Sequence, residues 1–384
     1  MRGIYVHIPF CVRKCAYCDF YSVAGDKAAI EEFRRLLVRE MDLLAREHPS
    51  EATAPADTVF FGGGTPTVLG AEALCGLLSA LRERFPIDGS AEVTTEANPG
   101  TVSAEDFRVL RKGGFNRVSI GVQSFTPRTL ATLGRIHGVE EVRAAHRDAR
   151  RAGFASIGLD LIFGIPGQEI SDWTADLDRT VTVLPSHVSA YALAPERGTP
   201  IHGAIERGEL RMPEDETVAE MYEETRASLS RTGYRQYEIS NFARPGAECR
   251  HNLKYWRREG TLGFGPSAHG LRFPPGKGPF GVRTSNPASL AEYRRRIGEG
   301  RLPWEEMRAC SREDAWKESL IAGLRMLDGI DLKETDSRIG PPPEAVRRAM
   351  ESLLQAGKLQ EEGSRLRLPP HLLFVSNEVL QALV

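Results

Sequence analysis

The sequence lacks an excess of charge of either sign, since its 384 residues include 50 Lys and Arg against 52 Asp and Glu. Without such an excess, no global field attracts an anionic membrane surface or nucleic acid, and we expect no nucleic-acid partner. No apolar run approaches the ~20 residues of a membrane-spanning helix. A strand predicted from Ile4 and a cysteine at position 11 leave no room for a signal peptide. These absences predict a cytoplasmic protein with no transmembrane segment.

Cysteine is also scarce, with six in the chain. Cys75, Cys249 and Cys310 stand singly, which suits a reducing cytoplasm better than a disulfide scaffold. The remaining three fall within eight consecutive residues. Such clustering in a cysteine-poor chain indicates a metal site.

The three clustered cysteines are Cys11, Cys15 and Cys18. A structural zinc site normally uses paired Cys-x2-Cys knuckles or added histidines, and the spacing here fits that scheme poorly. Closely spaced thiolates, normally four, hold a [4Fe-4S] cluster. Three thiolates leave one iron open to an outside chelator, such as the amino and carboxylate groups of S-adenosylmethionine (SAM). Zinc and a disulfide are the alternatives.

Short β-rich runs alternate with helix-like segments along the chain. In the first such segment, Phe33, Leu37, Met41 and Leu44 recur at three- and four-residue intervals, so one helical face can pack on a sheet. The strands are predicted at 3–8, 58–61, 92–95, 117–121, 158–163 and 188–193, and the helices at 27–47, 71–84, 103–113, 139–152, 171–184 and 215–232. This alternation predicts an α/β fold, a partial (β/α)6 barrel rather than a full barrel of eight units.

Unusual residues follow the carboxyl ends of these strands, where ligand sites gather in such folds. The run from Gly62 to Pro66 follows the second strand, Glu96 the third and Gln123 the fourth, and Asp160 lies within the fifth. Consecutive glycines let a ligand lie against the main chain, and a tight turn is the alternative reading. Their shared position at one end of the sheet favours a ligand site.

Taken in order, these motifs resemble the radical SAM superfamily, and more narrowly its branch of oxygen-independent coproporphyrinogen oxidases and heme chaperones. The resemblance spans nearly the whole chain and rests on Tyr5-Val-His-Ile-Pro-Phe-Cys11 through Phe20, Gly62-Gly-Gly-Thr-Pro66, Glu96-Ala-Asn-Pro99, Gly121-Val-Gln-Ser-Phe125, Leu133-Gly-Arg-Ile-His137 and Asp160-Leu-Ile-Phe-Gly-Ile-Pro166. It implies that the cluster is held by Cys11, Cys15 and Cys18. It further implies SAM contacts at Tyr5, Tyr17, Gly64, Thr65, Pro66, Glu96, Gln123, Arg135, Asp160 and Ala192. Carboxylates suit ribose hydroxyls or an ammonium, and an arginine suits a carboxylate, although ordinary buried ion pairs would use the same residues.

Two features separate the branches of this family. The oxidases have a further cysteine two positions after the third, where this chain has Phe20. The chaperones carry a His-Asn-x-x-Tyr-Trp motif, present here from His251 to Trp256. Imidazole is a common axial ligand of heme iron, and aromatic rings can pack on a porphyrin, so the resemblance implies that His251 binds heme. A packing role for His251 is the alternative; Cys249 ranks second as a ligand, and His269 is a further candidate to line the cavity.

The carboxyl-terminal region departs from the βα rhythm. Helices are predicted at 312–327 and 343–355, followed by a hairpin at 358–360 and 365–368, which suggests a winged-helix-like module without a basic DNA-reading face. The Pro- and Gly-rich stretch 273–287 is predicted to be a loop. The expected domains are a radical SAM core at 1–235, a connecting segment with the heme motif at 236–300, and a helical, winged-helix-like domain at 301–384.

The function that these features favour is that of a heme chaperone, which binds heme, a [4Fe-4S] cluster and SAM and passes heme to apo-hemoproteins. The alternatives are oxygen-independent coproporphyrinogen oxidase, or another radical SAM enzyme acting on a porphyrin, and a regulator that senses iron or redox state. Phe20 counts against the oxidase, and the ordered SAM motifs count against a pure sensor. The sequence leaves open whether the chain turns over SAM or forms a homodimer.

Overall fold

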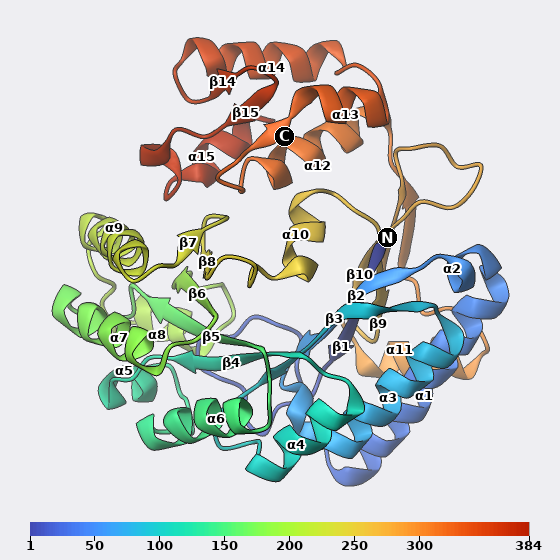
Figure 1. The fold of residues 1–384 in the computed structure, drawn as a ribbon, viewed down its shortest axis with the longest axis horizontal. Coiled ribbons are helices and arrows are strands. Elements are labelled where there is room, and N and C mark those ends of the chain that lie inside the picture. Colours follow the sequence, from blue (N-terminus) through green and yellow to red (C-terminus); the bar gives the residue numbers. More distant parts are fainter. Residues whose placement is uncertain (384) are drawn as a thin grey trace.

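Six parallel strands, each followed by a helix, build the first part of the chain in a computed structural model that describes residues 1–383 (Figure 1). The strands are β1 (Arg2–Ile8), β2 (Ala56–Gly63), β3 (Ile87–Ala97), β4 (Arg117–Gln123), β5 (Ser156–Phe163) and β6 (His187–Ala192). The main helices are α1 (Lys27–Glu47), α3 (Ala71–Arg84), α4 (Ala104–Gly113), α6 (Val139–Arg151), α7 (Ile170–Val183) and α9 (Asp215–Arg231). Shorter helices are α2 (Pro49–Thr53), η1 (Pro66–Leu69), α5 (Pro127–Thr132) and α8 (Pro200–Glu206). The predicted partial (β/α)6 barrel is confirmed.

Helix α1 illustrates why these segments are helical. The Asp26 side chain caps its amino terminus by accepting a hydrogen bond from the backbone N–H of Ala29. The apolar residues predicted to share one face, among them Phe33 and Leu37, are buried. The helices lie outside the curved sheet, which leaves its inner face for the site (Figure 1).

The sheet extends beyond the six predicted strands, in the order β12-β11-β10-β9-β1-β2-β3-β4-β5-β6-β8-β7. The added strands are β7 (Arg235–Gln236), β8 (Asn241–Ala243), β9 (Thr261–Phe264), β10 (His269–Arg272), β11 (Val282–Ser285) and β12 (Glu306–Ala309). Strand β9 runs parallel to β1, and β10 to β12 continue as antiparallel neighbours. The prediction of a loop at 273–287 is therefore wrong for Val282–Ser285, because β10 and β12 supply pairing partners on both sides. The 236–300 segment thus contributes strands to the same sheet.

Strand β4 shows how the sequence separates the two faces of the sheet. Side chains alternate along a strand, so every second residue faces the same way. Val118, Ile120 and Val122 are buried in the apolar core. The alternate residues border the cavity inside the barrel, namely Arg117, Ser119, Gly121 and Gln123. The inner face is consequently polar and available for a ligand.

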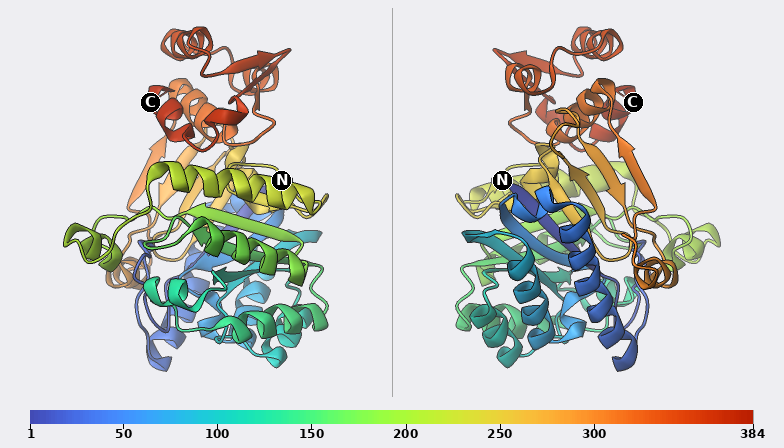
Figure 2. Two further views of the ribbon diagram at one scale, coloured as in Figure 1. Left: turned by 90° about the vertical axis from the view of Figure 1, so that its left-hand side faces the viewer. Right: turned by 90° about the vertical axis from the view of Figure 1, so that its right-hand side faces the viewer.

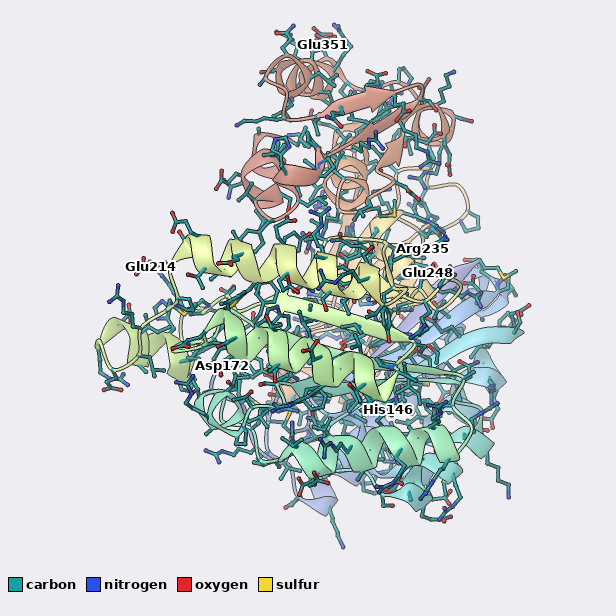
Figure 3. All side chains as sticks on the ribbon, turned by 60° about the vertical axis from the view of Figure 1, so that its left-hand side comes forward. His146, Asp172, Glu214, Arg235, Glu248 and Glu351 are labelled. Atoms are coloured by element: carbon teal, nitrogen blue, oxygen red, sulfur yellow. The ribbon has the colours of Figure 1, made fainter. Side chains whose placement is uncertain are left out.

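The carboxyl-terminal part packs across the open side of the incomplete barrel (Figures 1 and 2). Its elements are α12 (Arg312–Gly323), β13 (Ile330–Asp331), α13 (Leu332–Ile339), α14 (Glu344–Gln355), β14 (Gln360–Glu362), β15 (Arg365–Arg367), η2 (Pro370–Leu372), α15 (Ser376–Leu380) and η3 (Gln381–Leu383), and the strands pair in the order β13-β15-β14. The two predicted helices and the hairpin are present, with the first helix ending at Gly323 rather than 327. Helix α13 and strand β13 were missed by sequence reasoning. Figure 3 places Glu351 of α14 at the outer end of this part, far from His146 of α6.

Two short helices complete the description, α10 (Arg250–Trp256) and α11 (Leu290–Gly298). Helix α10 lies between the barrel and the carboxyl-terminal part, where the Arg325 guanidinium sits 5.0 Å from the centre of the Trp256 ring. Within residues 1–383, no helix is long and apolar enough to cross a membrane.

Candidate functional site

A cavity of about 600 Å³ occupies the interior of the barrel. This volume lies within the ~300–1,000 Å³ range of small-molecule and cofactor pockets. The predicted site residues that border it are Tyr5, Cys11, Cys15, Tyr17, Cys18, Gly64, Thr65, Glu96, Gln123, Arg135, Asp160, Ala192 and His251. Pro66 does not border it, because Pro66 begins η1 and is buried there. The fold therefore brings the cysteine loop and the segment that begins at His251 to one cavity.

The three clustered cysteines lie on the loop that follows β1 and are partly exposed, free thiols. Cys11 Sγ is 3.5 Å from Thr65 Oγ1, and Cys15 Sγ accepts a hydrogen bond of 3.4 Å from Arg135 Nη1. Burial raises the pKa of the Cys18 thiol, so a metal would have to displace its proton. Within residues 1–383, no three His, Cys, Asp or Glu side chains converge as ligands of one metal ion. Thiolates of a four-iron cluster bind separate irons and need not converge in that way.

Gly64 shapes the cysteine loop. A Cβ at this position would lie 2.7 Å from the Phe10 carbonyl oxygen and 3.0 Å from Cys11 Sγ. The backbone N–H groups of Gly64 and Thr65 donate to the carbonyls of Ile8 and Phe10. The glycine thus allows the end of β2 to pack directly against the first cysteine, and it exposes main chain to the cavity.

Two carboxyl groups, Glu96 and Asp160, face the cavity from β3 and β5. Burial, reinforced by the nearby Asp160, raises the pKa of Glu96 to about 8. Burial also raises the pKa of Asp160, although its oxygens accept 3.0 Å hydrogen bonds from Ser119 Oγ. A cationic or hydroxyl-rich ligand would satisfy both groups, which is the chemistry that a SAM ammonium and ribose present.

Arg135 supplies a cation at the same end of the cavity. Its Nη2 donates to Asn98 Oδ1 at 2.5 Å and to the Gly121 carbonyl at 2.7 Å, while its buried Nε has no partner within residues 1–383. Gln123 adopts a φ of 66°, a left-handed conformation that is uncommon outside glycine and turns the end of β4 toward this group. The donor set, the exposed main chain and the paired carboxyls fit a SAM molecule beside the cysteines.

His251 lies at the opposite end of the barrel. Its neighbours include Gly3 and Thr58, near the beginnings of β1 and β2, whereas the cysteines follow the end of β1. A strand the length of β1 spans roughly 20 Å at ~3.3 Å per residue. The imidazole and the cluster loop are thus separated by about one strand length within one cavity.

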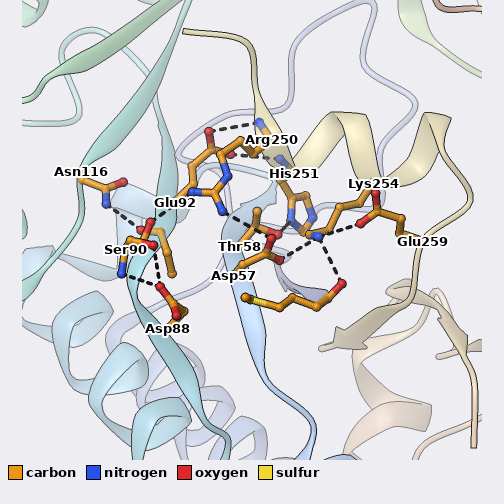
Figure 4. Close-up of polar contacts among 12 residues, drawn as sticks. Asp57, Thr58, Asp88, Ser90, Glu92, Asn116, Arg250, His251, Lys254 and Glu259 are labelled. Atoms are coloured by element: carbon orange, nitrogen blue, oxygen red, sulfur yellow. Dashed lines mark hydrogen bonds and ion pairs between the residues drawn. The ribbon is translucent and has the colours of Figure 1, made fainter. Parts of the chain in front are cut away.

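Helix α10 is held in place by carboxylates on β2 and β3 (Figure 4). Glu92 accepts hydrogen bonds from the backbone N–H groups of Arg250 and His251 at 3.1 and 3.0 Å. The buried Lys254 ammonium lies 2.7 Å from Asp57 and 2.9 Å from Glu259. These contacts fix the orientation of the helix that carries the motif.

The His251 ring is 1 % exposed and engaged at both nitrogens. Nδ1 lies 2.8 Å from Thr58 Oγ1 and Nε2 lies 3.1 Å from the Tyr255 hydroxyl, while the ring stacks on Phe60 with 5.2 Å between centroids. Burial lowers the pKa of His251 to about 3, so the ring is neutral near pH 7. Neutral imidazole is the form that binds metals, and one hydroxyl must release its nitrogen for that to happen.

The other candidate heme ligands differ from His251. Cys249 borders the cavity, but burial raises its pKa to about 11, which keeps it a thiol rather than a thiolate near pH 7. His269 begins β10, is exposed and does not border the cavity, so the expectation that it lines the cavity is wrong. Sequence reasoning missed Arg117 and His187, which do border it. Their only sequence signal is a lone cationic or imidazole group at the start of an apolar strand.

Comparison with known proteins gives the family. The Radical SAM superfamily model matches residues 5–179, and the HemN C-terminal domain model matches residues 310–374. The chain is 37 % identical to the heme chaperone HemW of Mycobacterium tuberculosis, over 100 % of this chain and 94 % of that protein. It belongs to the HemW family. HemW of Bacillus subtilis is 33 % identical over 100 % of this chain and 99 % of its own length.

A solved structure agrees on the fold. Coproporphyrinogen III oxidase (HemN) from Escherichia coli superimposes with a TM-score of 0.82 at 24 % identity, covering 99 % of this chain and 89 % of that one. HemW from Escherichia coli is 34 % identical over 99 % of this chain and 97 % of its own length. The fold and the family expected from the motifs are therefore confirmed, and the superfamily implies a [4Fe-4S] cluster and SAM.

Proposed function

We propose that this protein is a cytoplasmic heme chaperone, which binds heme together with a SAM-ligated [4Fe-4S] cluster and delivers the heme to apo-hemoproteins. The observation that carries the proposal is the intact motif from His251 to Trp256, on a helix that borders the same cavity as the three clustered cysteines. The shared name of its HemW relatives supports the same reading.

The residues for each group are distinct. The cluster would be held by Cys11, Cys15 and Cys18, and SAM by the loops that carry Gly64, Thr65, Gln123 and Arg135 and by the carboxyl groups of Glu96 and Asp160. When bound, a cluster of this kind with SAM supplies one-electron chemistry. The chain itself orients the ligand, since Arg135 and the exposed main chain of Gly64 set its position, and the apolar strands exclude water from behind it.

His251 would serve as the axial ligand of heme iron. Its ring is neutral, its helix is anchored by Glu92, and Phe60 stacks on it while the Tyr255 ring stands perpendicular to it. Release of the Tyr255 hydroxyl from Nε2 would free a nitrogen for the iron. Because the cysteine loop lies at the other end of the cavity, heme can bind without displacing the cluster.

Porphyrinogen oxidation is the second candidate, since the fold matches that of HemN. Phe20 weighs against it, because its side chain borders the cavity and is 63 % exposed at the place where the oxidases are expected to carry a further cysteine. A phenyl ring can neither bind iron nor exchange a thiol proton.

Delivery can be tested with hemin-loaded, cluster-reconstituted protein and apomyoglobin as a generic acceptor, followed by stopped-flow absorption. A chaperone should transfer heme more than about tenfold faster than serum albumin loaded with hemin does, and the rate should depend on acceptor concentration. Transfer that is slower than the albumin control and independent of the acceptor would contradict delivery. Formation of oxidised porphyrin from coproporphyrinogen with SAM would instead favour the oxidase.

A further inference from the structure

The cavity contains a second group of polar side chains that the cluster, SAM and His251 leave unused. Arg117 is 2 % exposed and His187 is 1 % exposed, and both border the cavity. They stand at the first positions of β4 and β6, and so at the same end of the barrel as His251. A buried arginine normally needs a partner for its charge and its N–H groups.

These donors surround a gap created by Gly158. Ser119, Gly158 and His187 lie side by side across β4, β5 and β6. A Cβ placed on Gly158 would lie 3.2 Å from Ser119 Oγ, 3.5 Å from His187 Nδ1 and 3.6 Å from Arg117 Nη2. The missing side chain thus leaves a space bounded by three polar atoms.

Two of the three bounding groups still have hydrogen-bonding capacity. Ser119 Oγ donates to Asp160, so it is committed. Arg117 Nη1 donates to Ser156 Oγ at 2.9 Å, but Nε has no partner within residues 1–383. Although burial opposes it, the nearby Cys249, Glu92 and Asp160 raise the pKa of Arg117, but none of them accepts a hydrogen bond from its side chain within residues 1–383. The guanidinium therefore keeps unused donors.

The hydrogen bonds of His187 make its free nitrogen a donor. Burial holds the pKa of His187 well below its ordinary value, so the ring is neutral. Its Nε2 lies 2.9 Å from the Tyr237 hydroxyl, which also accepts a hydrogen bond from the backbone N–H of Cys249; because the structure gives the hydroxyl hydrogen no other acceptor within residues 1–383, we assign that hydrogen to Nε2. The proton of the ring then sits on Nδ1, which has no partner within residues 1–383.

We propose that Arg117 and His187 Nδ1 form a carboxylate-binding subsite over Gly158, which takes one propionate of the porphyrin whose iron His251 binds. The carboxylate would accept from both donors and neutralise the buried guanidinium. This inference rests on the proposed function, and it explains why the cavity carries a buried cation at the end of the barrel where His251 lies.

The test compares hemin with hemin dimethyl ester, in which both propionates are neutral, by absorption titration of cluster-reconstituted protein. Wild type should bind hemin about tenfold more tightly than the ester, equivalent to about 1.4 kcal/mol, and Arg117→Gln should bind the two alike. Gly158→Ala, which fills the gap, should also lose the preference for hemin over its ester. This variant provides the test if Arg117→Gln fails to fold. Arg143→Gln, on the exposed surface of α6, is the matched control and should keep the preference.

Two outcomes would overturn the proposal in distinguishable ways. Equal affinity of wild type for hemin and its ester, or a preference retained in both Arg117→Gln and Gly158→Ala, would refute the carboxylate subsite alone. No saturable binding of either compound by wild type would refute heme binding itself, and the subsite with it.

Discussion

Replacing Glu96 by glutamine should change how the stability of the SAM-free protein depends on pH. The folded-state pKa of Glu96 is about 8, against an ordinary value of 4.5, so the folded protein holds a proton that the unfolded chain has released between these values. The contribution of Glu96 to stability should therefore be full below about pH 4.5 and should be lost as pH rises toward 8, whatever the net slope set by the other buried groups. The glutamine side chain carries no ionisable group, so the variant should lack this part of the fall.

The magnitude follows from the same pKa. A difference of one bound proton between the folded and unfolded states lowers the free energy of unfolding by about 1.36 kcal/mol per pH unit. Over the range from pH 5 to pH 8, the upper limit of this loss is roughly 4 kcal/mol. Because Glu96 borders the cavity and partly meets water there, we discount this to about 2 kcal/mol. Asp160 is present in both proteins, but it raises the pKa of Glu96, so the difference between the two proteins reports the coupled pair rather than Glu96 alone.

The assay is urea unfolding of wild type and Glu96→Gln at pH 5, 6, 7 and 8 without SAM, followed by circular dichroism. Wild type should lose about 2 kcal/mol more than the variant over this range. Glu140→Gln on the exposed surface of α6 is the control and should behave as wild type. Identical pH slopes for wild type and Glu96→Gln would refute a protonated, buried Glu96.

Three further predictions concern the cluster loop and the motif helix. Cys15→Ala should remove cluster iron and sulfide with the far-ultraviolet circular dichroism unchanged, and an unaltered iron content would disprove the cluster assignment. Tyr255→Phe removes the hydrogen bond between the Tyr255 hydroxyl and His251 Nε2, whose net contribution is about 1 kcal/mol. Hemin should therefore bind about fivefold more tightly, as measured by absorption titration. Weaker binding would show that the hydroxyl assists heme binding instead. Lys254→Met leaves Asp57 without its closest cation. The free energy of unfolding, measured by urea denaturation, should fall by about 2 kcal/mol. An unchanged value would mean that the ion pairs do not stabilise α10.

Hydrophobic periodicity was sufficient to predict the barrel because each of its helices has one continuous apolar face. Helix α13 was missed because it has only eight residues, about two turns, and buries only Thr335 and Ile339, which is too short a segment to establish a pattern. Strand β11 was missed because four residues between Pro- and Gly-rich turns gain their strand conformation from β10 and β12. Strand β11 thus depends on pairing with neighbouring strands, which its own four residues do not reveal.

The site residues likewise divide into those marked by local sequence motifs and those brought together only by the fold. The cysteine spacing and the glycine run marked the cluster end of the cavity, because both motifs are local in sequence. Arg117 and His187 meet only through the register of three strands, and their strands begin 70 residues apart in numbering, at 117 and 187. His251 was identified as a ligand candidate, but its location one strand length from the cysteine loop follows from α10 packing on β2 and β3.

The most direct test of the central claim is an anaerobic hemin titration of cluster-reconstituted protein, comparing wild type with His251→Ala and with His269→Ala as the exposed-histidine control. We expect a saturable one-site Soret spectrum for wild type and His269→Ala, and at least tenfold weaker binding for His251→Ala with its cluster absorption retained. Equal, unsaturating binding by all three proteins would contradict heme binding at His251.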